Sequence, residues 1–520
     1  MPGEAVEVRR TENGRVRGRG SVRGVLAFLG IPYAAPPFGA NRFREPCPVR
    51  RWEGVRDCRS FGPVAPQSAE LPGMPAWSPG REDILTLNIW TPAAPGGPLP
   101  VVVWIHGGAY TFGSSAQPDF DGTALARAGV VLVSMNYRLG FEGFGHMPSE
   151  AGPRCPENRG LLDQLAALEW VRDNIAAFGG DPTNVTVAGQ SAGATSAACL
   201  MVMERARGLF RRVIAHSPVG PCFPAELAVE TTHRVAAAAG VPATSAGLAS
   251  ATPEALIVAS EQVVRDYRGC PGSGARYYNP VIDGDVLPGD PVSLAARAAT
   301  GGVDLLVCHT AEEGWLLHAT DSIPAVTTGE QLADFTEAFQ LPDELIEGYR
   351  GLMPGAPVLD LYLAVFGDLL FSQYAWRLAE AHARSGGRAF ESCFARRRTA
   401  PPAVVHAWHC ADIPFAFGTL TDENVAFLIG RSPTAADHRL SRRMGEAWAG
   451  FATDGHPGWR PVGSPGAAGR TWSTPDSPAL PDNAAIHDLW RRKLQGEWRP
   501  PRRDRPGSAA QTDRPQGTVG

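Results

Sequence analysis

One serine of this 520-residue chain has a setting that suits a nucleophile. The stretch VTVAGQSAGATSAACL, residues 185–200, places Ser191 between two glycines, after an apolar run of strand character and before a helix of small residues. A strand, a tight glycine turn and a helix predict a nucleophile elbow, which exposes the serine oxygen where the helix dipole favours negative charge. An ordinary glycine-rich turn is the alternative, because Gly-x-Ser-x-Gly alone is a weak signal.

A second glycine motif offers hydrogen-bond donors for the same chemistry. The strand-like run VVVWI leads into HGGAY, residues 106–110, whose backbone N–H groups are unhindered. Attack of a serine on an ester carbonyl passes through a tetrahedral oxyanion, which preorganised backbone donors stabilise by about 3–4 kcal/mol. Two strand-to-glycine motifs in this order therefore favour acyl transfer over two unrelated turns.

The same chemistry requires a base and an acid, because serine is a poor nucleophile at neutral pH. Glu313 follows the apolar run 303–308, and His409 follows AVVHAW, residues 403–408, which we expect to be a strand. Both lie just beyond the carboxyl ends of expected strands, where open α/β sheets place their sites. Position alone leaves rivals open, and these are Asp304, Glu312, His309, His318, His406 and His456.

The elements that must position these residues alternate along the chain. Short Val/Ile/Leu-rich runs predict strands at 98–105, 130–137, 184–189, 303–308 and 403–408. A helical pattern fills 158–178 and ends at Gly179 and Gly180. This alternation predicts an α/β fold with a central, mostly parallel sheet flanked by helices.

Composition argues against several classes of function. The formal net charge is −5 and the arginines are scattered, so no nucleic-acid partner is expected. Nine cysteines without CxxC pairs favour free thiols over a metal site. The first residues lack the apolar core of a secretory signal, and we find no apolar run of membrane-spanning length. We therefore expect a cytoplasmic protein without a membrane partner.

Several longer segments of the chain have a recognisable pattern. They are GIPYAAPPFGANRFREP (30–46), EDILTLNIW (82–90), HGGAYTFG (106–113), NYRLG (136–140), the helical stretch 158–182, GQSAGA (189–194), HCADIPFAFG (409–418) and AWAGFATDGHP (447–457). Together they resemble the type-B carboxylesterases, the family that contains cholinesterases and bacterial p-nitrobenzyl esterases. The resemblance covers about residues 5–490. It implies one α/β-hydrolase domain over 1–495, with long insertions that form a gorge over the site; we expect 496–520, rich in Pro, Gly and Arg, to be a disordered tail.

The resemblance assigns a role to each candidate. It implies a serine hydrolase that cleaves carboxylic esters with small to medium apolar groups through an acyl-enzyme, without cofactor or metal. Two alternatives remain, a carbamate or amide hydrolase with the same triad and a non-catalytic binding or adhesion relative of the fold. The implied triad is Ser191, Glu313 and His409, and the implied oxyanion donors are the N–H groups of Gly108, Ala109 and Ala192.

The resemblance also implies two buried structural salt bridges. They would join Arg42 to Glu82 and Arg138 to Asp163. Loss of one partner of such a pair typically costs about 3–5 kcal/mol, so we expect these residues to stabilise the fold rather than to take part in catalysis.

The chain departs from the family at several positions. Gln190 stands where many members have glutamate, which removes one negative charge near the serine, and Ile84 replaces a disulfide cysteine of secreted members. Proline follows Ser217 where the family has glycine, which leaves the usual supporting role of Ser217 open.

Aromatic residues could form an apolar gorge or belong to the core. Trp77 loosely resembles the cholinesterase loop that holds a quaternary ammonium by cation–π attraction. The residues concerned are Trp77, Tyr110, Phe112, Trp315 and Phe371.

Overall fold

A computed structural model describes most of the chain. It covers residues 7–493 except 23, 69–75, 95, 149–154, 268–276, 298–299, 301, 399–403, 431 and 479. The expected tail at 496–520 and Cys270 therefore lie outside the described residues.

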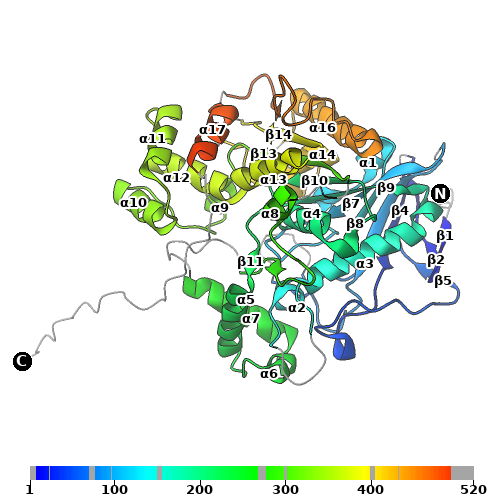
Figure 1. Ribbon diagram of the computed structural model, residues 1–520. Helices are drawn as coiled ribbons and strands as arrows, with labels where there is room; N and C mark the ends of the chain where they lie inside the picture. The colour runs from blue at the N-terminus through cyan, green and yellow to red at the C-terminus, as the bar shows by residue number, and fades with distance from the viewer. Residues whose placement is uncertain are drawn as a thin grey trace, which may run out of the picture.

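A ten-stranded sheet occupies the centre of the molecule (Figure 1). Its strand order is β15-β14-β13-β10-β9-β7-β8-β6-β4-β3. Neighbours from β15 to β8 pair in parallel, whereas β6, β4 and β3 add antiparallel strands at one edge. The mostly parallel sheet confirms the predicted α/β class. The strands are β3 (Arg19–Val22), β4 (Val25–Pro32), β6 (Thr86–Pro92), β7 (Leu99–Ile105), β8 (Val131–Met135), β9 (Gly180–Gln190), β10 (Arg212–His216), β13 (Asp304–Thr310), β14 (Ala389–Phe394) and β15 (Arg470–Trp472).

Helices cover both faces of this sheet because its central strands are apolar on both sides. Along β7, Val101, Val103 and Ile105 join one hydrophobic core, and Val102 and Trp104 join a second core across the sheet. The first core also receives α3 (Arg159–Asn174), α4 (Ala192–Val202) and α13 (Gln373–Arg384), and the second receives α1 (Thr123–Arg127), α14 (Ile413–Phe417) and α16 (Ala435–Asp454).

Two groups of helices extend beyond the sheet layers (Figure 1). The lower group in that view is α5 (Ala225–Ala238), α6 (Ser245–Ser250) and α7 (Pro253–Tyr267). The upper group is α9 (Gly314–Ala319), α10 (Gly329–Ala338), α11 (Asp343–Leu352), α12 (Val358–Gly367) and α17 (Asn483–Lys493), which share a third hydrophobic core. Smaller pairings are β1 (Val8–Thr11) with β2 (Gly14–Arg17) and β5 (Val55–Asp57), and β11 (Phe223–Pro224) with β12 (Val281–Ile282).

Two local predictions have different outcomes. The helix over 158–178 is confirmed as α3 followed by a 3-10 turn, Ile175–Phe178, and it ends at Gly179 with φ 85°. The strand expected at 403–408 is wrong, because its described part makes only an isolated bridge between Val405 and Arg398. The sheet edge beside β14 is taken by β15 instead, so this segment runs as a loop.

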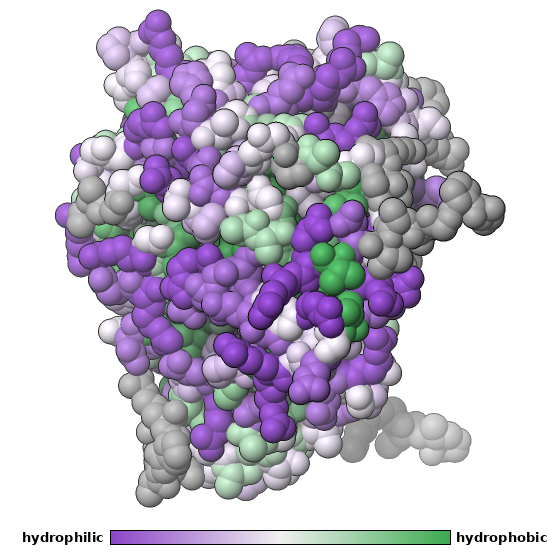
Figure 2. All heavy atoms as spheres, turned by 90° about the vertical axis from the view of Figure 1, so that its right-hand side faces the viewer, coloured by the Kyte–Doolittle hydropathy of each residue, from purple (hydrophilic) through white to green (hydrophobic). Residues whose placement is uncertain are grey.

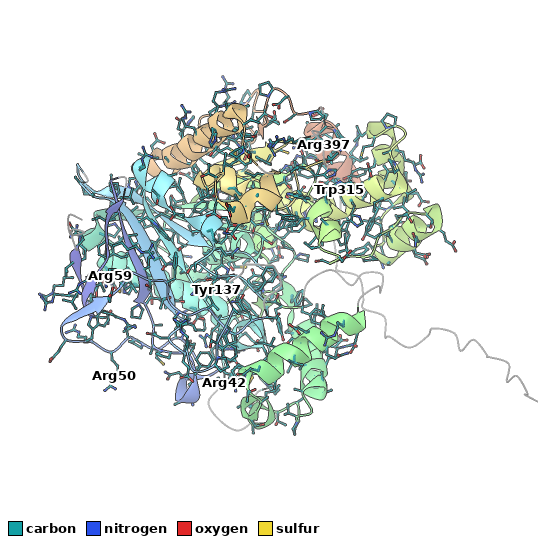
Figure 3. All side chains as sticks on the ribbon, turned by 180° about the vertical axis from the view of Figure 1, so that it is seen from behind. Arg42, Arg50, Arg59, Tyr137, Trp315 and Arg397 are labelled. Carbon is teal, nitrogen blue, oxygen red and sulfur yellow. The ribbon has the colours of Figure 1, made fainter. Side chains whose placement is uncertain are left out.

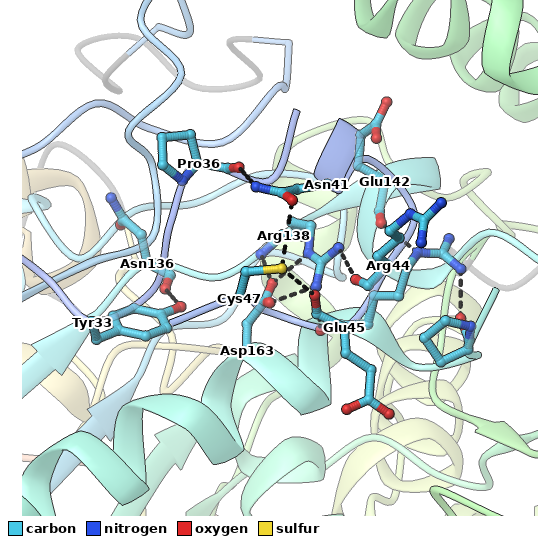
Figure 4. Close-up of polar contacts among 12 residues, drawn as sticks. Tyr33, Pro36, Asn41, Arg44, Glu45, Cys47, Asn136, Arg138, Glu142 and Asp163 are labelled. Carbon is cyan, nitrogen blue, oxygen red and sulfur yellow. Dashed lines mark hydrogen bonds and ion pairs between the residues drawn. The ribbon is translucent and has the colours of Figure 1, made fainter. Parts of the chain in front are cut away.

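Of the two predicted salt bridges, one is confirmed and the other is wrong. Arg138 and Asp163 form a fully buried pair, with Nη2 2.7 Å from Oδ1 and Nε 2.8 Å from Oδ2 (Figure 4). The pairing of Arg42 with Glu82 is wrong: Glu82 is exposed, and the Nη2 of Arg42 lies 2.5 Å from Oε1 of Glu142. Glu142 belongs to α2 (Gly140–Phe144), which folds back beside the loop of Arg42.

One continuous helical run, 358–384, has the length and apolar composition of a membrane span. This differs from the expectation of no such run, but most of it is buried inside the fold, as in the core helix of a globular protein. The face of the molecule drawn in Figure 2 is mostly hydrophilic and shows hydrophobic residues only in small separate groups.

Candidate active site

Ser191 occupies a strained turn between β9 and α4. Its backbone has φ 55° and ψ −123°, a combination that costs a non-glycine residue free energy and persists only where the surroundings enforce it. The glycines on either side permit the turn, since a Cβ at Gly193 would lie 2.0 Å from the carbonyl oxygen of Ile105 and one at Gly189 would lie 2.3 Å from that of Gly193. The structure therefore has the shape predicted for a nucleophile elbow.

Three backbone N–H groups near Ser191 are available as donors. Gly108 and Ala109 have φ of 110° and 50°, in a turn closed by N–H groups of Thr111 and Phe112 that donate to the carbonyl oxygen of Gly108. Ala192 begins α4, where the first N–H groups of a helix have no intrahelical acceptor. Within the described part of the chain, no acceptor binds the N–H groups of Gly108, Ala109 or Ala192.

Glu313 and His409 form a buried pair at the same edge of the sheet. Nδ1 of His409 lies 2.6 Å from Oε2 of Glu313, and the two residues are 5% and 2% exposed. The other carboxylate oxygen accepts hydrogen bonds from the Ser217 hydroxyl at 2.6 Å and the Thr310 N–H at 2.7 Å. Ser217 thus contacts the acid directly, although proline follows it. The carboxylate is fixed and can orient the imidazole.

Backbone hydrogen bonds join the loops that carry these residues. The N–H of Ser191 donates to the carbonyl oxygen of His216 at 2.8 Å, and that of Ser217 donates to Cys308 at 2.7 Å. The N–H of Ala311 donates to Phe394 at 2.9 Å. These bonds continue the parallel pairing beyond the ends of β9, β10, β13 and β14, so the main chain itself fixes the spacing of the candidate site.

The second ring nitrogen of His409 contacts Gln190 rather than Ser191. Nε2 of His409 lies 2.9 Å from Nε2 of the Gln190 amide, and no hydrogen bond to the Ser191 hydroxyl is found among the described residues. Burial disfavours the imidazolium, but Cys410 and Glu313 favour it and raise the pKa of His409 well above its ordinary value. The serine and histidine therefore share one site in which the hydrogen bond between them is not formed, which is common before substrate binds.

The rival acid and base from the sequence form a pair of their own. Nδ1 of His406 lies 2.8 Å from Oε1 of Glu312, whose other oxygen accepts the N–H of Ala407 at 2.9 Å. The His406 ring stacks on Trp315 with centroids 3.7 Å apart. Arg397 lies 3.8 Å from Glu312, and Arg397 and Trp315 appear together in the upper part of Figure 3. This second pair joins the loop of His409 to the loop of Glu313.

The other rivals bond to or pack on partners other than Glu313 and His409. Asp304 is bound by Arg388 at 2.6 Å, and Nε2 of His309 accepts the indole N–H of Trp376 at 3.2 Å. His456 is exposed and its Nδ1 accepts the Gly458 N–H, while the His318 ring packs on Trp315.

A buried pair that the sequence did not reveal supports the His409 loop. Nδ1 of His216, at the end of β10, contacts the carboxylate of Asp412, and its Nε2 accepts the indole N–H of Trp448 at 3.1 Å. Burial opposes a charge on His216, whereas Cys308 and Asp412 favour it and raise its pKa. The bond that Nε2 accepts from Trp448 leaves the ring proton on Nδ1. His216 therefore holds Asp412, which lies three residues after His409, through a hydrogen bond donated by Nδ1. No local pattern connects residues this far apart in the sequence.

The candidate site opens into a cavity of about 1430 Å³. Ser191, His409 and the three candidate donors line it, together with apolar side chains of α7, α9, the π-helical turn Asp368–Ser372 and α15 (Ala426–Ile429). Of the aromatic candidates, Tyr110, Phe112 and Phe371 line this cavity, but Trp77 and Trp315 do not. The comparison of Trp77 with a cation-binding loop therefore has no support from the described cavity.

Two tyrosine hydroxyls fix the backbone around the donor loop, which is residues 106–110 with the N–H groups of Gly108 and Ala109. The Tyr137 hydroxyl, in the middle of the molecule in Figure 3, donates to the carbonyl oxygen of His106 at 2.8 Å. The Tyr110 hydroxyl donates to the carbonyl oxygen of Ala192 at 2.7 Å. Burial lowers the pKa of His106 to about 4, so its ring stays neutral beside the loop.

A strained serine after a central parallel strand, with an acid and a histidine beyond later strands, defines an α/β hydrolase. The chain belongs to the carboxylesterase family, which it matches over residues 5–472. This confirms the resemblance drawn from the sequence.

Several known proteins are similar to this chain over most of its length. The para-nitrobenzyl esterase of Bacillus subtilis is 35% identical over 88% of this chain and 91% of its own. The fumonisin B1 esterase of Sphingopyxis macrogoltabida is 36% identical over 86% and 82%, and the phenmedipham hydrolase of Pseudarthrobacter oxydans is 33% identical over 84% and 87%. The solved carboxylesterase EST55 of Geobacillus stearothermophilus aligns with a TM-score of 0.80 at 34% identity, covering 93% of this chain and 99% of that one.

Proposed function

We propose that this carboxylesterase cleaves esters with small to medium apolar groups, with Ser191 as nucleophile, His409 as base and Glu313 as the acid that orients the base. One observation carries the proposal. A strained serine, three backbone donors without acceptors in the described chain and a buried acid–histidine pair surround a single cavity.

Acylation follows from this arrangement. The Ser191 hydroxyl turns to Nε2 of His409, gives up its proton there and forms a bond from Oγ to the ester carbonyl carbon. The carbonyl oxygen becomes an oxyanion, which accepts hydrogen bonds from the free N–H groups of the 108–109 turn and the start of α4. Collapse of this intermediate breaks the bond to the alcohol, and the alcohol leaves with the proton from His409. Glu313 keeps its contact with Nδ1 of His409 throughout and stabilises the imidazolium.

Hydrolysis of the acyl-enzyme repeats these steps with water. Water gives a proton to Nε2 of His409 as its oxygen attacks the acyl carbon. The bond to Oγ of Ser191 then breaks, Oγ recovers the proton and the carboxylic acid is released.

The mutation Ser191→Ala tests the proposal. We expect wild-type protein to release p-nitrophenol from short-chain acyl esters at neutral pH, and the variant to lose about 10³-fold or more of kcat. A fluorophosphonate probe should label wild type and leave the variant unlabelled. Turnover by the variant within tenfold of wild type would remove Ser191 as nucleophile, and absence of turnover and burst in wild type would contradict esterase activity toward these substrates.

Carbamate or amide hydrolysis is the second candidate. It is favoured by the 33% identity to a phenmedipham hydrolase, and the same acylation steps apply with a different leaving group. Matched ester, carbamate and anilide substrates, with phenmedipham included, separate the two. A higher kcat/KM for a nitrogen-containing substrate than for its ester would make this second candidate the main activity.

A further inference from the structure

The side chain of Gln190 lies between the donor loop and the imidazole of the candidate triad. Gln190 is the last residue of β9, is 4% exposed and lines the cavity. Its Nε2 is 2.9 Å from Nε2 of His409, and its Oε1 would lie 2.6 Å from a Cβ built on Gly107. The amide therefore contacts the imidazole through its nitrogen, and its oxygen lies close to Gly107, where no larger residue would fit beside it.

The direction of this hydrogen bond restricts the protonation of His409. An amide nitrogen only donates, so Nε2 of His409 must accept and carry no proton. The proton of the neutral ring is then on Nδ1, which donates to Glu313. An imidazolium would carry a proton on Nε2 as well, and this N–H would face the N–H of Gln190. The contact therefore favours the neutral ring and opposes the effect of Glu313.

We propose that Gln190 is a positioning residue that holds Nε2 of His409 as a hydrogen-bond acceptor and so keeps the imidazole in the neutral form required of a general base. This inference rests on the proposed function, in which His409 takes the serine proton. The amide reserves the lone pair of Nε2 until the Ser191 hydroxyl replaces it there. Gln190 also forms no bond with substrate in this role.

The other neighbours of His409 are few or already paired, so the effect of one added charge on the imidazole can be measured. Glu313 and Cys410 act on it directly, and the ring of Phe371 packs against it with centroids 4.2 Å apart. Farther groups are already paired, since Asp412 contacts His216 and Asp368 accepts the Tyr349 hydroxyl. A glutamate at position 190 would thus be a second anion beside the imidazole, in place of a neutral donor.

The test compares Gln190→Glu with Gln117→Glu. Gln117 lines the same cavity, and its Oε1 accepts the Ser114 N–H at 3.1 Å, a bond that glutamate can keep. Both variants add one carboxylate to the cavity wall, but only Gln190→Glu places it against His409. The measurement is kcat/KM against pH with a p-nitrophenyl ester. The quantity compared between wild type and the variants is the pH at which kcat/KM falls on the acid side of the profile, called the acid limb.

We expect the acid limb of Gln190→Glu to move up by about one pH unit or more, because a carboxylate within hydrogen-bond distance favours the charged ring. At a pH on that limb, kcat/KM should fall about tenfold relative to wild type, and the loss should diminish above it. The acid limb of Gln117→Glu should stay at the wild-type pH. A third variant, Gln190→Met, removes the donor without adding charge, and its limb should lie between those of wild type and Gln190→Glu.

Three results would overturn the inference. The limb could stay in place in both variants of Gln190 while the plateau falls, which would indicate a packing role alone. It could move equally in Gln117→Glu, which would indicate a general charge effect of the cavity. It could move down in Gln190→Met, which would mean that the amide favours the charged ring. Ser191→Ala, measured in parallel, separates these results from failure of the proposed function, since turnover by that variant within tenfold of wild type disproves the triad whatever the pH profiles show.

Discussion

Replacing Glu313 with glutamine should abolish the base function of His409 while leaving the shape of the site intact. Oε1 of Glu313 accepts hydrogen bonds from Thr310 and Ser217, and Oε2 faces Nδ1 of His409. In Glu313→Gln the single amide oxygen must keep facing the two donors, so the amide nitrogen faces Nδ1. The ring must then accept at Nδ1 and carry its proton on Nε2. That tautomer cannot take the proton of serine.

The expected loss is large because two effects coincide. The variant holds the wrong tautomer and also lacks the charge that stabilises the imidazolium. An acid-to-amide change of this kind in a serine triad lowers kcat by about 10⁴-fold, which corresponds to about 5 kcal/mol of added barrier. The assay is kcat for p-nitrophenyl ester hydrolysis at neutral pH, with folding checked by intrinsic fluorescence and thermal unfolding.

Glu312→Gln is the matched control. It makes the same chemical change one residue earlier, where the carboxylate contacts His406 and the Ala407 N–H and not His409. We expect this variant to keep kcat within about tenfold of wild type, because the triad hydrogen bonds remain. A folded Glu313→Gln protein that keeps a tenth of wild-type kcat would refute this reasoning. A loss of more than about tenfold in Glu312→Gln would refute it as well.

Three further predictions concern the stability of the fold and the turn at the serine. Arg138→Met should lower the free energy of unfolding by about 3–5 kcal/mol, because it leaves the charge of Asp163 buried and unpaired; denaturant titration measures this, and an unchanged midpoint would contradict it. Burial raises the pKa of Asp368 from 3.8 to about 7, so this group stabilises the fold below pH of about 4 and that stabilisation is lost as the pH rises to about 7. Between pH 5 and 8, wild type should therefore lose about 3 kcal/mol that Asp368→Asn does not lose, and parallel denaturation curves for both proteins would disprove the assignment. Gly193→Ala should lower kcat at least about 100-fold, since the new Cβ would meet the carbonyl oxygen of Ile105 at 2.0 Å; fluorophosphonate labelling at the wild-type rate would show that the turn tolerates it.

The sequence predicted a structural feature correctly where the residues that determine it lie close together along the chain. The turn at Ser191 needs an apolar strand, two glycines and a small-residue helix, and all three lie within one short stretch. The donor turn at Gly108 and the helix α3 follow from equally local patterns. These features, and the mostly parallel sheet that their alternation predicts, agree with the structure.

Choices between neighbouring residues could not be made from position. Glu312 and Glu313 lie on one turn after β13, and His406 and His409 lie on one loop. The structure pairs the first glutamate with the first histidine and the second with the second. Which pair faces Ser191 depends on the path of both loops, and the resemblance to the family was needed to select one.

Contacts between distant segments were also beyond the sequence. The pairing of Arg42 with Glu82, which the resemblance implied, is wrong because the fold brings Glu142 beside Arg42. The apolar run at 403–408 has strand character, but the place at the sheet edge is occupied by the short strand β15. The contact between Gln190 and His409 joins residues 219 positions apart and has no signal in either segment.

The backbone bonds beyond the ends of β9, β10, β13 and β14 have a consequence for how such an enzyme can diversify. They set the spacing of the proposed catalytic residues through the main chain, which substitutions of side chains leave largely unchanged. The cavity walls come instead from α7, α9 and α15, which lie outside this network of strand-end hydrogen bonds. Selectivity for acyl or alcohol groups can therefore drift, or be evolved in a library restricted to those helices, without rebuilding the catalytic geometry. Inherited chemistry and acquired substrate range are thus separable in this molecule.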